Sequence, residues 1–361
     1  MNDPLEEAIA PELAARGPVS LTARLLELLE QQFSPRALEA MLGRSGVEAE
    51  RALWRSSLYG PLHHFLSRPG KALRATLVDA SYRIAGGRGQ CPVELGLIVE
   101  VLHAGSLIID DIEDGSLERR GAPALHCEIG LPLALNAGNW LYFWACALVE
   151  RLELGPHAEL GVHRWLSRTM LSCHYGQALD LELRVGEVTQ ERVRSLVDSA
   201  TRLKTGCLVQ LAAALGAIAA GAQREHVSAL AGFGLDLGVS LQMLDDLSGL
   251  TSKRRLHKGL EDLREGRPTW PWAWLADSLD EATFAELQAR SRELTLGSEA
   301  DASRRAEELA LKLEAALGAS GRVHIREHGR VALARLVSRL GTAVALTQAA
   351  ALVRELEQAY G

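Results

Sequence analysis

Apolar residues recur along this chain every three to four positions, the spacing that places them on one face of an α-helix. The pattern predicts a series of helices separated by glycine- and proline-rich stretches. They are expected over 21–42, from 71 onward, and over 92–114, 133–153, 157–184, 190–221, 224–250 and much of 279–361. No two segments alternate as paired strands would. The sequence therefore predicts an all-α fold, a single-domain helical bundle over 21–361 preceded by a loose arm over 1–20.

The composition of the chain argues against several classes of protein. The 361 residues are 47% hydrophobic and 24% charged, which is ordinary for a globular protein. The net charge of -7 argues against a nucleic-acid partner. The five cysteines are widely spaced and form no CxxC pair, so neither a disulfide framework nor a zinc site is expected.

Two apolar stretches, 140–149 and 208–222, are the nearest candidates for a membrane span. Neither reaches the ~18 uninterrupted apolar residues that a spanning helix needs. Both fit buried helices better, and the acidic start of the chain lacks a signal pattern. We therefore expect a cytoplasmic protein without a membrane span.

An acidic cluster ends the helix predicted over 92–114. Asp110 and Asp114 lie one turn apart on the stripe that also holds His103, and Asp111 lies beside them. Like charges at this spacing repel each other, so a cation is expected between them. Mg2+ prefers oxygen ligands and is commonly held by a few carboxylates together with substrate phosphates. A solvated helix end is the alternative, but the apolar run 107–109 just before the cluster favours a functional site.

Cationic residues near this cluster favour a phosphate ligand. Arg119 and Arg120 follow the cluster, and guanidinium groups match phosphate oxygens. Lys71 and Arg74 share the first turn of a predicted helix, where a second phosphate could bind. Taken alone, the second pair is equally compatible with two surface cations, and His103 with an ordinary core histidine.

A second acidic pair, Asp245 and Asp246, also follows an apolar helical segment, with Gln242 one turn earlier. Two such pairs are expected to face each other across a cavity, with metal ions between them. Weaker signals point to the same chemistry. They are Gln177 and Asp180 on one helix face, a break at Lys204 to Gly206, and the charges of Lys258 and 261–267.

Taken in order, these segments resemble the trans-isoprenyl diphosphate synthases, the polyprenyl synthetase family, and geranylgeranyl diphosphate synthases most of all. The matching stretches are 70–74, 110–123, 176–181, 204–206, 242–246 and 258–271. The resemblance implies an all-α bundle around a deep apolar cavity (the isoprenoid synthase fold), usually as a homodimer. It also implies a Mg2+-dependent head-to-tail (1'-4) condensation of isopentenyl diphosphate with an allylic diphosphate.

The resemblance also implies a role for each matching residue. Three Mg2+ ions would be held by Asp110, Asp111, Asp114, Asp245 and Asp246. Isopentenyl diphosphate would be bound by Lys71, Arg74, His103 and Arg120. The allylic diphosphate would be bound by Arg119, Lys204, Thr205, Gln242, Lys258 and Arg267. The residues implied in catalysis are Asp110, Asp111, Asp114, Lys204 and Asp245.

The sequence departs from the family pattern at three positions. Gly249 stands where the second motif commonly has Asp or Asn, Ala72 stands for Arg, and Arg267 stands for Lys. Gly249 leaves two alternatives open, a non-catalytic partner subunit and a terpene cyclase of related fold. Retention of both phosphate sites argues against each of them.

Product length is predicted from residues on two helices. Small residues, Gly105 and Ser106, precede the first motif, so the cavity is not closed at farnesyl length. By type and spacing, the deeper residues Tyr142, Phe143 and His174 resemble the floor of geranylgeranyl diphosphate synthases. The expected product is geranylgeranyl diphosphate, with farnesyl diphosphate next, and ordinary helix packing of these three residues is the alternative.

Overall fold

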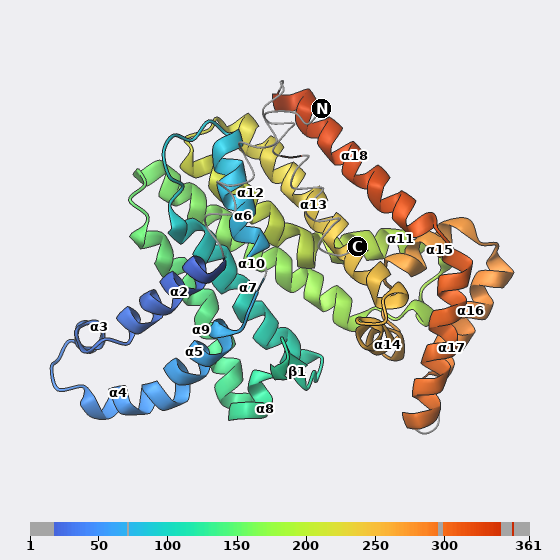
Figure 1. Cartoon of the computed structure of the whole chain (residues 1–361), viewed down its shortest axis with the longest axis horizontal. Helices are drawn as coiled ribbons and strands as arrows, with labels where there is room; N and C mark the ends of the chain where they lie inside the picture. Colours follow the sequence, from blue (N-terminus) through green and yellow to red (C-terminus); the bar gives the residue numbers. More distant parts are fainter. Residues whose placement is uncertain (1–17, 71, 295–298, 341–348, 350–361) are drawn as a thin grey trace, which may run out of the picture. The chain divides into compact units, whose positions relative to one another are not determined.

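The computed structural model describes residues 18–70, 72–294, 299–340 and 349, and the described chain is almost entirely helical (Figure 1). The predicted all-α fold is confirmed. Of the predicted loose arm, 1–17 lies outside the described residues and 18–20 belong to the first described helix. The chain divides into two compact units, one of Met1–Thr76 with Gln90–Gly155 and the other of Leu77–Gly89 with Pro156–Gly361. The single-domain organisation stays a prediction.

The first unit is built around α7 (Val93–Glu113), which packs along α9 (Leu131–Ala147). Its other helical elements are α2 (Pro18–Gln32), α3 (Pro35–Leu42), α4 (Glu48–Trp54), η1 (Arg55–Tyr59), α5 (Gly60–Ser67), α8 (Leu125–Ile129) and η2 (Leu148–Arg151). Glycines bring α7 and α9 together. A Cβ at Gly105 would lie 2.9 Å from the carbonyl oxygen of Gly138 and 3.1 Å from the Tyr142 ring. The small residue before the first acidic cluster is therefore required for helix packing.

A short hairpin lies where the sequence predicts only a loop. The strands β1 (Glu118–Arg119) and β2 (Ala122–Pro123) pair antiparallel and have two residues each. Such short strands leave no alternating pattern for the sequence to show. The hairpin fixes the backbone of the two consecutive arginines that follow α7.

The second unit is built around α13 (Arg224–Thr251), which packs against α12 (Cys207–Ala219) and α18 (Ser320–Leu340). Its other helical elements are α10 (Pro156–Glu182), η3 (Val185–Glu187), α11 (Gln190–Thr201), η4 (Arg202–Gly206), α14 (Leu256–Arg264), α15 (Trp270–Ser278), α16 (Glu281–Glu293) and α17 (Glu299–Leu317). Three tryptophans of α15, Trp270, Trp272 and Trp274, are completely buried in its core. Helix α6 (Leu73–Ile84) runs from the first unit into the second.

The helix predicted over 190–221 is interrupted. Between α11 and α12 the chain forms one turn of π-helix, η4, which contains Lys204, Thr205 and Gly206. The predicted break at this motif is therefore confirmed. Single π-turns inside longer helices are common at functional sites, because they redirect a few side chains without ending the helix.

Two helical stretches in the described chain, Gln190–Ala219 and Arg224–Thr251, are long and apolar enough to cross a membrane. In their most apolar windows, 61% and 72% of the residues are buried inside the protein. Core helices pass the same test of length and composition, so the finding is weak evidence for a span.

Candidate active site

The three aspartates at the end of α7 divide into two kinds. Asp111 is completely buried, and its Oδ1 accepts hydrogen bonds from Nε of Arg119 at 2.7 Å and from Nη2. Burial raises the pKa of Asp111, and Arg119 opposes that rise. Asp110 and Asp114 remain partly exposed, one helical turn apart. Asp111 therefore anchors Arg119, whereas Asp110 and Asp114 can bind a ligand.

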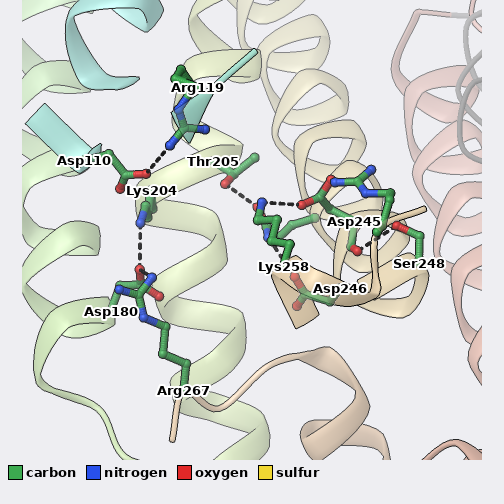
Figure 2. Close-up of polar contacts among 12 residues, drawn as sticks. Asp110, Arg119, Asp180, Lys204, Thr205, Asp245, Asp246, Ser248, Lys258 and Arg267 are labelled. Atoms are coloured by element: carbon green, nitrogen blue, oxygen red, sulfur yellow. Dashed lines mark hydrogen bonds and ion pairs between the residues drawn. The ribbon is translucent and has the colours of Figure 1, made fainter. Parts of the chain in front are cut away.

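The hairpin after α7 presents its two arginines differently. Arg119 turns back to the acidic cluster, with Nη2 3.8 Å from Oδ2 of Asp110 (Figure 2). Arg120 has a φ of 56°, a left-handed conformation that is costly for a residue with a Cβ. The side chain of Arg68 stabilises this backbone by donating hydrogen bonds to the carbonyl oxygens of Arg119 at 3.2 Å and Pro123 at 2.9 Å.

Two arginines and a histidine lie close together in the first unit. His103 is buried, and its pKa is lowered well below the ordinary value by burial and then by Arg74, Arg120 and Arg119. Burial also lowers the pKa of Arg120. The nearby carboxylate of Glu100 opposes this shift, and Arg119, Arg74 and Arg68 add to it. Nδ1 of His103 and Nε of Arg74 are buried without a hydrogen-bond partner among the described residues. Unpartnered buried donors among like charges indicate a site for an anion.

Lys71, which the sequence adds to this cluster, lies outside the described residues. Gly70, directly before it, packs its backbone against Arg120. A Cβ at Gly70 would lie 3.4 Å from the guanidinium nitrogens. The structure thus brings together three of the four residues predicted for isopentenyl diphosphate, namely Arg74, His103 and Arg120.

In the second unit, Asp245 and Asp246 near the end of α13 have different partners. Oδ2 of Asp245 accepts a hydrogen bond from Nζ of Lys258 at 2.8 Å (Figure 2). Oδ1 accepts one from Nη2 of Arg255. Burial is the strongest influence and raises the pKa of Asp245, but Lys258 and Arg255 together bring it below its ordinary value. Asp245 is therefore an ionised carboxylate held by two cations.

Asp246 is an internal link. It accepts hydrogen bonds from Nε2 of Gln242 at 2.7 Å and from the backbone N–H of Trp270 at 2.9 Å. Oε1 of the same glutamine accepts a hydrogen bond from Thr205 Oγ1 at 2.7 Å, so one chain of bonds joins η4, α13 and α15. Burial raises the pKa of Asp246 to about 7. This carboxyl group therefore positions its neighbours.

Asp180 on α10 gathers two of the predicted phosphate-binding cations. Its Oδ2 lies 2.6 Å from Nζ of Lys204 and 3.3 Å from Nη1 of Arg267 (Figure 2). Arg267 also pairs with Glu265, at 2.6 Å from its Nε. The carboxyl group of Asp262 lies near Arg267 and Lys258, and burial raises its pKa to about 6.

Two residues important to this geometry are missed by the sequence interpretation. Arg255 contacts Asp245, and Arg68 supports the hairpin. A signal for Arg255 existed in the basic run 253–255, which ends three residues before Lys258. Arg68 directly precedes a proline and gives no comparable signal.

The side chains of the site show which metal ion they could bind. Among the described residues, no three His, Cys, Asp or Glu side chains lie close enough to hold a metal ion by themselves. Asp110 and Asp114 offer hard carboxylate oxygens at the end of α7. Mg2+ is typically bound by one or two carboxylates, substrate phosphates and water. The residues present therefore fit Mg2+ that arrives with a phosphorylated substrate.

The predicted chain-length residues have unequal exposure. Tyr142 is partly buried beside Gly105, whereas Phe143 is 73% exposed and His174 is also exposed. Their role stays a prediction, as does the expectation that the two acidic pairs face each other across a cavity.

Comparisons with known proteins agree with this chemistry. The sequence model of polyprenyl synthetase matches residues 55–300, so the chain belongs to the polyprenyl synthetase family. A geranylgeranyl diphosphate synthase of Sulfolobus acidocaldarius is 34% identical over 218 residues, which cover 59% of this chain and 64% of that protein. A short chain isoprenyl diphosphate synthase of Methanocaldococcus jannaschii is 32% identical, with the same two coverages. The chain thus spans slightly less than two thirds of these two relatives.

Solved structures show the same fold over nearly the whole chain. The crystal structure of a geranylgeranyl pyrophosphate synthase aligns with a TM-score of 0.75 at 22% identity, covering 94% of this chain and 98% of the other. A polyprenyl synthase from Caulobacter crescentus CB15, complexed with calcium and isoprenyl diphosphate, aligns with a TM-score of 0.67 at 25% identity. That match covers 94% of this chain and 97% of the other. The predicted family and the isoprenoid synthase fold are confirmed.

Proposed function

We propose that this protein is a prenyltransferase that condenses isopentenyl diphosphate head-to-tail (1'-4) with an allylic diphosphate. The observation that carries the proposal is the cluster of Arg74, His103 and Arg120, in which Nε of Arg74 and Nδ1 of His103 are buried without a hydrogen-bond partner among the described residues. This cluster is a candidate anion site in addition to the two acidic segments. A prenyltransferase needs two diphosphate sites because it binds two substrates. A cyclase binds one diphosphate, and a non-catalytic subunit needs neither.

The proposed product is geranylgeranyl diphosphate. Support comes from relatives of that name, at 34% identity for the protein of Sulfolobus acidocaldarius, and from the absence of an aromatic side chain at positions 105 and 106. Tyr142, beside Gly105 on the neighbouring helix, is the most enclosed of the three proposed floor residues.

The chemistry begins with breaking the C–O bond between the allylic group and its diphosphate. Lys204, Lys258 and Arg267 would neutralise the charge that develops on the departing diphosphate, which is stabilisation aimed at the transition state. Mg2+, proposed as three ions held by Asp110, Asp114 and Asp245, would supply further neutralisation of that leaving group. These aspartates are suitable because each retains carboxylate oxygens within the charged clusters described above.

The residues of the first unit would hold the second substrate. Arg74, His103 and Arg120 would bind the diphosphate of isopentenyl diphosphate and so orient its double bond for attack. A C–C bond then forms, a proton leaves the condensed intermediate, and the released diphosphate accepts it. Arg119, held by buried Asp111, would supply charge beside Asp110.

A homodimer is proposed as the working form. Two large apolar side chains one turn apart on α10 remain exposed, namely Tyr175 at 63% and Leu171 at 59%. Exposed apolar side chains of this size, when clustered, mark protein interfaces.

The test is to incubate the purified protein with Mg2+, isopentenyl diphosphate and each allylic primer, and to identify the products by mass spectrometry. A linear prenyl diphosphate is the expected result. A cyclic hydrocarbon or alcohol from an allylic substrate alone would establish a cyclase, and no product from folded protein would indicate a partner subunit.

A variant pair makes this test specific to the proposed site. Arg74→Gln should raise KM for isopentenyl diphosphate by about tenfold or more, because a charge-assisted hydrogen bond to phosphate is lost. Arg83→Gln, on the same helix but in an exposed pair with Asp79, is the matched control and should leave KM unchanged.

A further inference from the structure

Two glycines bring α13 and α14 into backbone contact in the second unit. A Cβ at Gly249 would lie 3.2 Å from Cα and 3.5 Å from the nitrogen of Gly259. A Cβ at Gly259 would collide with the carbonyl oxygen of Gly249. Any larger side chain at either position would force the helices apart. Gly249 therefore permits the close approach of α14 at this point.

This close contact positions two cations on Asp245. Arg255 directly precedes α14 and Lys258 lies in its first turn. Both reach the carboxylate of Asp245, one at each oxygen, with Lys258 Nζ at 2.8 Å. The three charges sum to an excess of one positive charge. Arg255 keeps 31% of its side chain exposed, so its guanidinium is accessible to a ligand.

We propose that Arg255 is a further diphosphate-binding residue of this protein. Together with Lys258 it would add to the counter-charge that the metal ion proposed at Asp245 supplies. The inference rests on the proposed function, because it assumes that the ligand at this site is a diphosphate. A guanidinium offers paired donors that match phosphate oxygens, and Asp245 holds it in place before the ligand binds.

The proposal is tested by calorimetric titration of the full-length protein with inorganic diphosphate, first in EDTA and then in Mg2+. Arg255→Gln should weaken binding in EDTA by about tenfold, because one charge-assisted contact is lost. Arg254→Gln is the matched control, since Arg254 is the exposed neighbour and should bind like the wild type. Arg255→Lys should give an intermediate affinity, because it keeps the charge without the paired donors.

A second variant tests the glycine contact. Gly249→Ala should move α14 by a few tenths of an ångström and weaken diphosphate binding in EDTA, while circular dichroism shows unchanged helix content. The two cation clusters are told apart by Arg74→Gln, which should weaken only the binding site of the first unit.

If Arg255→Gln and Arg254→Gln bind inorganic diphosphate equally well, the proposal is overturned. Its failure is distinguishable from failure of the proposed function. In one case the wild type condenses its substrates while Arg255 has no effect on binding. In the other, Arg255→Gln weakens diphosphate binding although the wild type forms no condensation product.

Discussion

Arg68 offers a direct test of how the arginine hairpin is held. Its side chain is only 5% exposed, and it ties the hairpin to α8. It donates hydrogen bonds to the carbonyl oxygens of Arg119 and Pro123 and to Oε1 of Glu128 at 2.6 Å. We expect Arg68→Met to keep the packing of the long stem while removing all three polar contacts.

The expected cost follows from these contacts. An ordinary hydrogen bond contributes about 1 kcal/mol net and one to a charged group contributes more, so these three contribute at least about 3 kcal/mol. Breaking a fully buried ion pair costs about 3–5 kcal/mol, but Glu128 is 23% exposed and water can solvate it after the change. We therefore expect Arg68→Met to lower the free energy of unfolding by about 3 kcal/mol, a factor of roughly 100 in the folding equilibrium.

Urea unfolding measures this loss, and Arg36→Met, at an exposed position of α3, is the control. Because Arg120 follows the hairpin strand that Arg68 supports, KM for isopentenyl diphosphate should also rise more than kcat falls. A stability loss below about 1 kcal/mol, together with an unchanged KM, would refute the reasoning.

Three further predictions concern packing, pH and product length. Gly216→Ala would place a Cβ against a carbonyl oxygen of α6 and should lower the free energy of unfolding by about 3 kcal/mol. Gly232→Ala, where a Cβ would have nothing within 4 Å, should raise it by up to about 1 kcal/mol. Urea unfolding of both variants measures the two changes. Burial raises the Asp262 pKa from 3.8 to about 6, so its contribution to stability is complete below pH 3.8 and lost as pH rises through about 6. Asp262→Asn should remove that loss, and identical pH profiles of urea midpoints for wild type and variant would contradict the assignment. Tyr142→Ala with Phe143→Ala should lengthen the prenyl product seen by mass spectrometry, and an unchanged product from the folded double variant would exclude the floor role.

The sequence predicts the helices well because the spacing of apolar residues is a local property of each segment. It also locates the break at Lys204, since threonine and glycine interrupt an apolar pattern there. The different partners of Asp110 and Asp111 could not be predicted in the same way. Adjacent residues on a helix point in different directions, and the hairpin that supplies Arg119 gives no strand pattern of its own.

Long-range contacts explain the other differences. Gly249 is a missing ligand when the sequence is compared with the family, yet in the structure it is a packing position whose partner, Gly259, lies on the next helix. The role of Arg255 depends on that contact, because only the close approach of α14 brings its guanidinium to Asp245. A sequence pattern shows which residue type stands at each position. The roles of Gly249 and Arg255 depend instead on the contact between the backbones of α13 and α14, which the pattern does not show.

The charged groups of the two units differ in how they are neutralised before any ligand binds. The cations assigned to the allylic diphosphate are already paired with carboxylates, as Lys204 is with Asp180 and Lys258 with Asp245. Arg74 and Arg120 form no ion pair among the described residues. A diphosphate that binds to the paired cations must replace their carboxylate partners. Its binding is therefore most favourable when another cation, such as a metal ion, neutralises the displaced carboxylate. In the cluster of Arg74 and Arg120, Glu100 offsets part of the charge of Arg120, and a ligand would supply further stabilisation without displacing an ion pair. The two sites would therefore differ in their dependence on metal ions even though both bind the same diphosphate group.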